Sequence, residues 1–411
     1  MINRKIIGAV CMAVCVSFTA CTSLRPDAGS SENAAGQESK AAQESSEENH
    51  SGPEESSRRS PAVDTSVEES SEPQAQTSSE TVERLLAAMT LEEKVGQMFL
   101  VRCPESGGAE AVSDWQFGGY VLFDRDFNGY SEEEAAERIA AYQENAKIPL
   151  IISVDEEGGT VTRVSDYFRD TPFWAPQELY AEGGWDLIIS DTKEKAELLK
   201  SLGINVNLAP VCDLPESEED FIYERSFGTD PELTSEFVVR TLEVMRQYKV
   251  GCVLKHFPGY GNNVDTHTGI AVDERSYDQF IKRDFLPFEA GIDAGAQAVL
   301  VSHNMISCMD PNVPASLSLK VHEQLRGQLG FSGVIITDDL AMDAITEFAG
   351  QKDAAVLAVE AGNDLLCCDD YEEQIPAVLE AVRIGEISES RIDESVRRIL
   401  DWKEQLGLLE S

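Results

Sequence analysis

The sequence of 411 residues is poor in basic side chains. It has 33 lysines and arginines against 75 aspartates and glutamates, which gives a formal net charge of −42 at pH 7. Such an excess of acid repels nucleic acids and anionic membrane surfaces. We therefore expect no nucleic-acid partner, and recognition of an anionic group would need a local basic pocket.

The residue spacings typical of a metal site are also missing. The five histidines and nine cysteines form no C-x-x-C pair and no His-rich tract, so we expect no structural zinc and no metal. The cysteines beyond the N-terminal region are Cys103, Cys212, Cys252, Cys308, Cys367 and Cys368. Most lie in apolar runs, where a free cysteine acts as a small buried hydrophobe. We expect no essential disulfide, although export would permit one.

The apolar run at the N-terminus, Ile6 to Phe18, is too short for a stable membrane span. Two basic residues precede it and Thr19-Ala20-Cys21 follows, which is the pattern of a secretory signal over residues 1–20. Small residues before a cysteine resemble a bacterial lipobox, in which Cys21 is acylated. The alternative is an ordinary signal peptide cut near Ala20. The lipobox predicts an extracytoplasmic protein that contacts the bacterial cell membrane only through its lipid anchor.

Residues 21–80 have almost no aromatic or large aliphatic side chains, and Ser, Glu, Gln, Ala and Pro dominate. Such a segment cannot bury enough apolar surface to offset its ordering entropy. The composition therefore predicts a disordered tether, and the mutual repulsion of its excess acidic side chains is expected to keep it extended. The folded domain is expected over residues 81–411.

Short apolar runs alternate with helical patterns through this domain. The predicted strands are Gly96–Arg102, Gly119–Phe123, Leu150–Val154, Asn205–Ala209, Cys252–His256, Ala298–His303, Gly333–Thr337 and Asp364–Cys368. Amphipathic helices are predicted at Glu132–Ala146, Thr192–Leu202, Glu232–Tyr248, Tyr277–Ala294, Leu319–Leu329, Asp353–Ala361 and Tyr371–Ile384. Continuous apolar strands separated by helices indicate a parallel sheet buried on both faces. The count and length favour an α/β fold of the (β/α)8 TIM-barrel type, with an open doubly wound sheet as the alternative.

Polar residues favour the barrel because they gather where predicted strands end. The clusters are Asp155-Glu156, Asp213, Lys255-His256, Ser302-His303-Asn304 and Asp338-Asp339. Barrel enzymes place their active sites on the face formed by the C-terminal ends of the strands. Polar αβ loops in general would explain one or two such clusters, but not five.

The stretch Lys255–Gly269 holds two histidines, a lysine and an aspartate among three glycines and a proline. Asp265 and His267 are two residues apart, so a turn would bring carboxylate to imidazole. An aspartate bonded to one ring nitrogen fixes the tautomer and leaves the other nitrogen to transfer protons. The alternative is an exposed loop with incidental polar residues.

Asp338 and Asp339 close the apolar run Ile335–Thr337. An aspartate at a rigid strand end suits a nucleophile that attacks the anomeric carbon of a sugar. The alternative is N-capping of a helix that begins at Leu340. Both uses are compatible, with Asp339 as the cap.

A third stretch runs from Val154 to Arg163 and contains Gly158-Gly159, which allow a close approach of backbone to a ligand. Asp155 is suited to accept hydrogen bonds from two adjacent sugar hydroxyls, and Arg163 to line the same pocket. The alternative is a tight turn with surface charges.

Together these stretches resemble glycoside hydrolase family 3, in its single-domain β-N-acetylglucosaminidase (β-N-acetylhexosaminidase) branch. The resemblance runs from about Thr90 to the C-terminus. Besides the stretches above, its motifs are Met89–Met98 and Glu224-Arg225-Ser226-Phe227-Gly228.

The resemblance implies a role for each matching residue. Asp338 would be the nucleophile, and His267 paired with Asp265 the acid/base. The implied sugar-binding residues are Asp155, Arg163, Arg225, Lys255 and His256. The reaction would be a retaining hydrolysis without a cofactor, and the expected partner is a carbohydrate with terminal N-acetylglucosamine, bound by a monomeric chain.

Two positions depart from the family pattern, with Thr160 where members commonly carry arginine and Tyr260 where they carry histidine. These departures concern substrate range. Competing activities on the same scaffold are those of a β-glucosidase, against which the Asp-x-His pair argues, and of an N-acetylglucosamine phosphorylase. A lipid-anchored sugar-binding protein without catalysis is the non-enzymatic alternative. Cell-wall turnover, acting on peptidoglycan fragments or related glycans, is the expected role.

Overall fold

The computed structural model describes residues 79–266, 269–349 and 351–409. This part of the chain begins with two helices, and the start of each follows from its capping residue. Ser79 caps α1 (Glu80–Ala88), and Thr90 caps α2 (Leu91–Gln97). The Thr90 hydroxyl accepts a hydrogen bond from the Glu93 amide and the Glu93 carboxylate accepts one from the Thr90 amide, which together form a capping box.

Eight parallel strands form one sheet in the order β10-β1-β2-β3-β4-β5-β7-β9. Their bounds are β1 Phe99–Arg102, β2 Gly119–Leu122, β3 Ile151–Val154, β4 Val206–Asn207, β5 Gly251–Phe257, β7 Ala298–Val301, β9 Val334–Thr337 and β10 Leu366–Cys368. A parallel bridge between Ile336 and Leu365 joins the two ends of that order, and the Thr337 amide donates to the Leu365 carbonyl at 3.1 Å. The sheet therefore closes on itself, which confirms the predicted barrel and excludes the open sheet.

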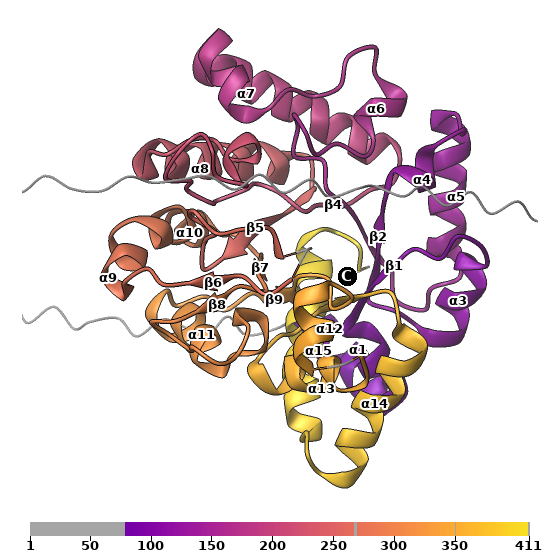
Figure 1. Ribbon diagram of the computed structural model, residues 1–411. Coiled ribbons are helices and arrows are strands. Elements are labelled where there is room, and N and C mark those ends of the chain that lie inside the picture. Colours follow the sequence, from indigo (N-terminus) through magenta and orange to yellow (C-terminus); the bar gives the residue numbers. More distant parts are fainter. Residues whose placement is uncertain (1–78, 267–268, 350, 410–411) are drawn as a thin grey trace, which may run out of the picture. The chain divides into compact units, whose positions relative to one another are not determined.

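Helices follow the strands and lie around the outside of the barrel (Figure 1). The longer ones are α3 Gly108–Trp115, α5 Glu132–Glu144, α7 Pro176–Ser201, α8 Pro231–Gln247, α10 Phe285–Asp293, α12 Asp343–Ala349, α13 Gln351–Ala361, α14 Tyr371–Ile384 and α15 Glu389–Gln405. The shorter ones are α4 Asp124–Phe127, α6 Ser165–Phe168, α9 Tyr277–Gln279 and α11 Leu319–Glu323. A small parallel pair, β6 (Val272–Asp273) and β8 (Met305–Ile306), lies outside the barrel sheet.

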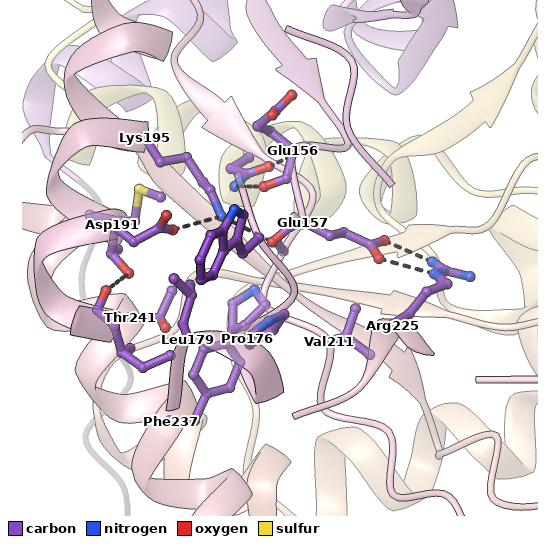
Figure 2. Close-up of a pocket in the computed structure, with 17 residues that line it drawn as sticks. Glu156, Glu157, Pro176, Leu179, Asp191, Lys195, Val211, Arg225, Phe237 and Thr241 are labelled. Atoms are coloured by element: carbon purple, nitrogen blue, oxygen red, sulfur yellow. Dashed lines mark hydrogen bonds and ion pairs between the residues drawn. The ribbon is translucent and has the colours of Figure 1, made fainter. Parts of the chain in front are cut away.

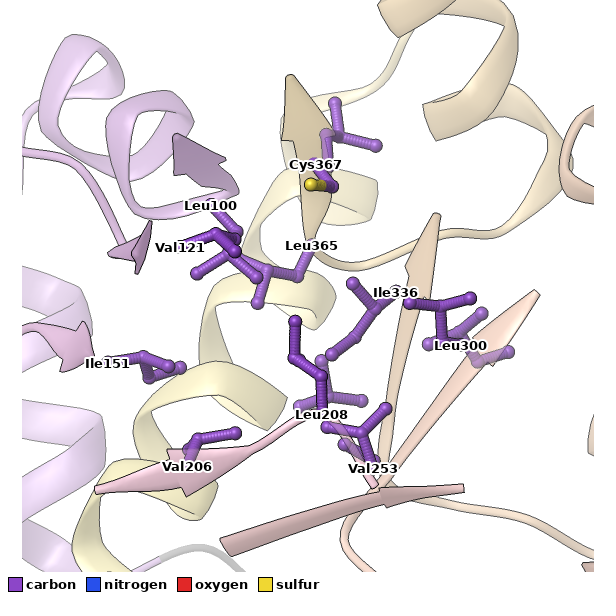
Figure 3. Packing of buried hydrophobic residues seen from close by; sticks show 14 of the residues in the cluster. Leu100, Val121, Ile151, Val206, Leu208, Val253, Leu300, Ile336, Leu365 and Cys367 are labelled. Carbon is purple, nitrogen blue, oxygen red and sulfur yellow. The ribbon is translucent and has the colours of Figure 1, made fainter. Parts of the chain in front are cut away.

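The barrel interior is filled by apolar side chains from successive strands. Figure 3 shows Leu100, Val121, Ile151, Val253 and Ile336 pointing toward one another. All five are buried. Because side chains alternate along a strand, residues two positions further on face the same interior at the C-terminal mouth. The core thus fixes which residues reach that mouth.

Several predicted boundaries were wrong. The first strand begins at Phe99 rather than Gly96, because Gly96 and Gln97 complete helix α2. The helix predicted from Thr192 begins at Pro176, and a kink at Gly184, with φ 59° and ψ −151°, interrupts its pattern. Helix α3 was not predicted at all. No helix starts at Leu340 either, since α12 begins at Asp343.

The N-terminal end of the barrel is closed by charged groups around Asp364, just before β10. Its buried carboxylate accepts the Ile335 amide at 3.0 Å and pairs with Arg326 at 2.5 Å and Arg398 at 2.9 Å. Burial would raise the pKa of Asp364, but the arginines beside it, Arg326 first, lower it. Helix α15, which carries Arg398, is thereby tied to the seam between β9 and β10.

In the described part of the chain, no helix is both long and apolar enough to cross a membrane. The six cysteines of this part are free thiols, and all except Cys308 are buried. Burial is the main cause that raises the pKa of the Cys103 thiol to about 12, which keeps it unreactive.

Lys403 of α15 is fully buried, and its Nζ donates to Gln97 Oε1 at 2.7 Å. Burial lowers the pKa of Lys403 from 10.5 to about 7. Between these two values the unfolded chain binds a proton that the folded chain does not, so stability rises with pH there. Below pH 7 both states are protonated and the full destabilisation is present.

Replacing Lys403 by methionine is therefore expected to remove a pH dependence of the unfolding free energy of up to about 1.4 kcal/mol per pH unit. The measurement is urea unfolding of wild type and Lys403→Met from pH 6 to 10. The difference between the two curves should shrink as pH rises. Lys193→Met, at an exposed position of α7, is the matched control and should leave the pH dependence unchanged. A pH-independent difference for Lys403→Met would contradict the prediction.

Candidate active site

The strand pattern brings three predicted site residues to the C-terminal mouth of the barrel. Asp155 follows interior Ile151 by four residues, Lys255 follows Val253 by two, and Asp338 follows Ile336 by two. The same count points Asp338, rather than Asp339, toward the interior. The alternation of side chains along β9 therefore indicates which of the two aspartates faces the mouth, which the composition alone does not.

The centre of the site is a buried carboxylate, Glu157, between two cations. Glu157 Oε1 lies 2.7 Å from Arg225 Nη2 and 2.6 Å from Lys255 Nζ, and Oε2 accepts Arg225 Nε at 3.0 Å. Lys255 Nζ also donates to Asp155 Oδ1 at 2.5 Å. The side chains of Glu157 and Lys255 are each 2% exposed. Four residues from three separate stretches of the chain thus form one ion cluster.

Electrostatics keep this cluster charged. Burial would raise the pKa of Glu157, but the charges of Arg225 and Lys255 hold it well below its usual range. Burial would likewise lower the pKa of Lys255, and the carboxylates of Asp155 and Glu157 raise it instead. Glu157, Arg225 and Lys255 therefore remain ionised and present fixed charges and donors to a ligand.

His256 is joined to the cluster through Arg225, whose Nη2 lies 3.2 Å from His256 Nε2. Arginine has only donors, so His256 Nε2 must accept. The proton is then on Nδ1, which donates to Asp213 Oδ2 at 2.7 Å. This arrangement fixes the tautomer that carries its proton on Nδ1 and leaves Nε2 to hold Arg225. His256 is suited to orientation and not to proton transfer.

The two aspartates that end β9 have different surroundings. Asp338 is half-buried, and one of its oxygens accepts the Asp339 amide at 3.0 Å. Asp339 instead accepts the Ala341 amide at 3.0 Å and pairs with Arg102 at 2.9 Å. Asp339 therefore holds the turn before α12 and leaves Asp338 as the aspartate of the mouth. The capping role predicted for Asp339 applies to this turn and not to a helix.

Arg163 lies apart from the ion cluster. Its Nη1 donates to the Thr162 carbonyl at 3.0 Å and is 3.7 Å from Asp124. Its guanidinium carbon lies 5.9 Å from the centre of the Phe123 ring. Within the described ranges, no hydrogen bond or ion pair joins the Arg163 side chain to Asp155 or Lys255.

The roles of three further residues, two in the predicted site and one in the predicted anchor, stay predictions. Asp265 is half-buried in the loop after β5. His267 and Cys21 lie outside the described residues. Among the described residues, no group of three or more histidines, cysteines, aspartates or glutamates is placed to hold a metal ion.

Sequence reasoning missed Glu157 and gave Asp213 no role. The balance of charges could have indicated Glu157. Two buried cations, Arg225 and Lys255, need more than one buried carboxylate, and Asp155 is only one. His303, which follows the end of β7, supports the turn that holds Asp339. Its ring nitrogens lie 2.7 Å from Ser316 Oγ and 2.9 Å from the Asp339 carbonyl.

A small cavity of about 30 Å³ lies behind Glu157, between the β3 loop and helices α7 and α8 (Figure 2). This volume admits about two water molecules, far less than a sugar ring. Lys195 lines it, donating to the Glu157 carbonyl at 2.9 Å and pairing with Asp191 at 3.6 Å. The cavity is therefore part of the support for Glu157 and not the substrate pocket.

Residues 90–402 match the N-terminal domain of glycosyl hydrolase family 3, and the chain belongs to this family. It is an enzyme, a glycoside hydrolase. The β-hexosaminidase of Xanthomonas campestris pv. campestris (strain B100) is 35% identical over 270 residues, which cover 64% of this chain and 80% of that protein.

Two solved structures extend the likeness. A family 3 β-N-acetylglucosaminidase from Paenibacillus sp. str. FPU-7 has a TM-score of 0.74 at 33% identity, with 79% of this chain and 64% of that chain covered. This chain thus spans less than two thirds of the Paenibacillus protein. A β-N-acetylhexosaminidase from Beutenbergia cavernae DSM 12333 has a TM-score of 0.67 at 29% identity, with 76% and 98% covered.

Changing Glu157 to glutamine leaves Arg225 and Lys255 with one buried counter-ion fewer. We expect the unfolding free energy to fall by about 3–5 kcal/mol, measured by urea unfolding at neutral pH. Glu236→Gln breaks the exposed pair with Arg240 and should cost less than about 1 kcal/mol. Equal losses in the two variants would show that Glu157 does not hold the cluster.

Proposed function

We propose that the chain is a retaining, exo-acting β-N-acetylhexosaminidase that releases terminal β-linked N-acetylglucosamine. The observation that carries the proposal is the ion cluster of Asp155, Glu157, Arg225 and Lys255 at the barrel mouth that Asp338 also reaches. The similarity to a β-hexosaminidase and to family 3 β-N-acetylglucosaminidases supports the choice of sugar.

In this proposal the ion cluster binds the non-reducing sugar. Carboxylate oxygens of Asp155 accept hydrogen bonds from sugar hydroxyls, and the guanidinium of Arg225 and the ammonium of Lys255 donate to them. His256 orients Arg225. Because these groups are held before the substrate arrives, little reorganisation is needed on binding.

Asp338 then attacks the anomeric carbon as its bond to the leaving oxygen breaks. His267, paired with Asp265, gives that oxygen a proton. In the second half, His267 takes a proton from water, the water oxygen attacks the same carbon, and Asp338 leaves as a carboxylate. Two inversions retain the β configuration. The amide of Asp339 bonds one oxygen of Asp338 and thereby orients the nucleophile.

The first test is release of p-nitrophenol from its β-N-acetylglucosaminide and its β-glucoside. We expect turnover of the first substrate, and Asp338→Asn should lower kcat/KM at least about 10³-fold because the nucleophile is lost. Asp339→Asn, the neighbouring control, should lose about tenfold or less, because it only loosens the turn.

The outcomes separate the competing activities. Turnover that requires added phosphate and yields a sugar phosphate would replace hydrolysis by phosphorolysis. Preference for the β-glucoside would refute the choice of sugar. Binding of N-acetylglucosamine without turnover of either substrate would refute catalysis altogether.

We further propose that Cys21 is acylated after removal of residues 1–20, and that residues 21–80 tether the enzyme outside the cytoplasm. The support is the Arg4-Lys5 start, the short apolar run and Thr19-Ala20-Cys21. There the enzyme would act on peptidoglycan fragments or related glycans.

The anchor has its own prediction. Expressed in a bacterium, the wild-type chain should sediment with membranes and take up radiolabelled palmitate. Cys21→Ser should lose the label and most of the membrane association. Cys308→Ser, the exposed cysteine of the barrel, is the control. A Cys21→Ser protein that keeps its label would refute acylation at this residue.

A further inference from the structure

Tyr260 is a buried tyrosine at the barrel mouth to which the proposed reaction gives no role. It is 2% exposed, and its hydroxyl lies 2.5 Å from Thr266 Oγ1. Thr266 is itself fully buried. In the chain, Thr266 stands between Asp265 and His267, the proposed acid/base pair.

Tyr260 is held rigidly on its other side. Its amide donates to Asp213 Oδ1 at 2.7 Å, while the other oxygen of Asp213 holds His256. The Tyr260 ring meets the His256 ring edge to face, with 5.1 Å between the ring centres. Asp213 therefore fixes Tyr260 to the sugar-binding cluster, and the tyrosine hydroxyl extends this fixed structure to Thr266.

The base of the same loop is also anchored. Arg275 Nη2 donates to the Gly259 carbonyl at 2.9 Å, and the side-chain Nδ2 of Asn263 donates to Asp273 Oδ2 at 2.8 Å. Arg275 in turn pairs with Asp273 and Asp284, each at 2.7 Å. These contacts hold residues 259–263, and the bond from Tyr260 acts three residues further on, next to Asp265.

The hydroxyl of Tyr260 remains protonated. Burial raises the pKa of Tyr260, and the negative charge of Asp338 raises it further. The group can therefore donate or accept a hydrogen bond but does not supply the proton of the reaction.

We propose that Tyr260 is a positioning residue for the proposed acid/base pair: its hydroxyl fixes Thr266 and thereby the adjoining Asp265. The inference rests on the proposed function. Proton transfer requires the acid within hydrogen-bond reach of the leaving-group oxygen, so a loss of placement acts on the step that protonates it.

The test compares two leaving groups on N-acetylglucosamine. A 2,4-dinitrophenyl glycoside departs as a stable anion and needs no proton, whereas a methyl β-glycoside needs one. For Tyr260→Phe, kcat/KM for the methyl glycoside should fall about 10- to 100-fold, and that for the dinitrophenyl glycoside less than about threefold. The parameter kcat/KM is used because it reports the step in which the leaving group departs.

Matched variants separate placement from general damage. Thr266→Val keeps the shape and removes the other hydroxyl, so it should give the same leaving-group dependence. The double variant should be no worse than either single one, since both remove one bond. Asn262→Ala removes an exposed bond from the same loop to Glu216 and should leave both substrates unaffected.

Each remaining outcome refutes a different statement. Equal losses on both substrates, or no loss on the methyl glycoside, would overturn the positioning role while leaving the proposed function intact. A wild-type enzyme that hydrolyses neither substrate would refute the proposed function and this inference together.

Discussion

The candidate site depends on one buried interaction, the carboxylate of Glu157 between Arg225 and Lys255. Two cations cannot lie side by side in a water-poor mouth without an anion between them, because each would lose its hydration uncompensated. Glu157 supplies that anion from the loop after β3, and its own backbone carbonyl is held by Lys195 of α7. The positions of Arg225, Lys255 and, through Arg225, His256 all follow from it.

The donors and acceptors of the ion cluster are fixed by their mutual hydrogen bonds. Each acceptor in it has a donor that stays protonated, and the His256 tautomer is fixed from both sides by Arg225 and Asp213. The pKa shifts of Glu157, Arg225 and Lys255 all favour the charged forms. Proton transfer then has to come from a group outside the cluster, and the loop after β5, which carries Asp265, is attached to it through Tyr260.

The barrel could be predicted from sequence because its strands are buried on both faces and read as continuous apolar runs. The face of the site could be predicted as well, since polar residues gather after those runs. The choice between Asp338 and Asp339 came only from the family resemblance, because the hydrophobic pattern alone does not show which strand residue faces the interior. Glu157 was missed because three acidic residues in succession, Asp155 to Glu157, look alike in a sequence, and only the fold shows which of them meets both cations.

The predicted boundaries of helices and strands were wrong where the backbone geometry departs from the hydrophobic pattern of the sequence. Gly184 kinks α7 and conceals its first half, and Gly96 belongs to a helix although it precedes an apolar strand. The sugar-binding role of Arg163 stays a prediction; its guanidinium lies beside Asp124 and Phe123.

The closure of the barrel has a consequence for the timing of folding. The first strand pairs with the last, Phe99 with Leu366 and Val101 with Cys368, and Glu83 of α1 bonds Arg397 of α15. No N-terminal fragment can complete these contacts, so the ring cannot form until almost the whole chain has been synthesised. For the export proposed above, this order of closure would keep the chain unfolded enough to pass through a translocation pore.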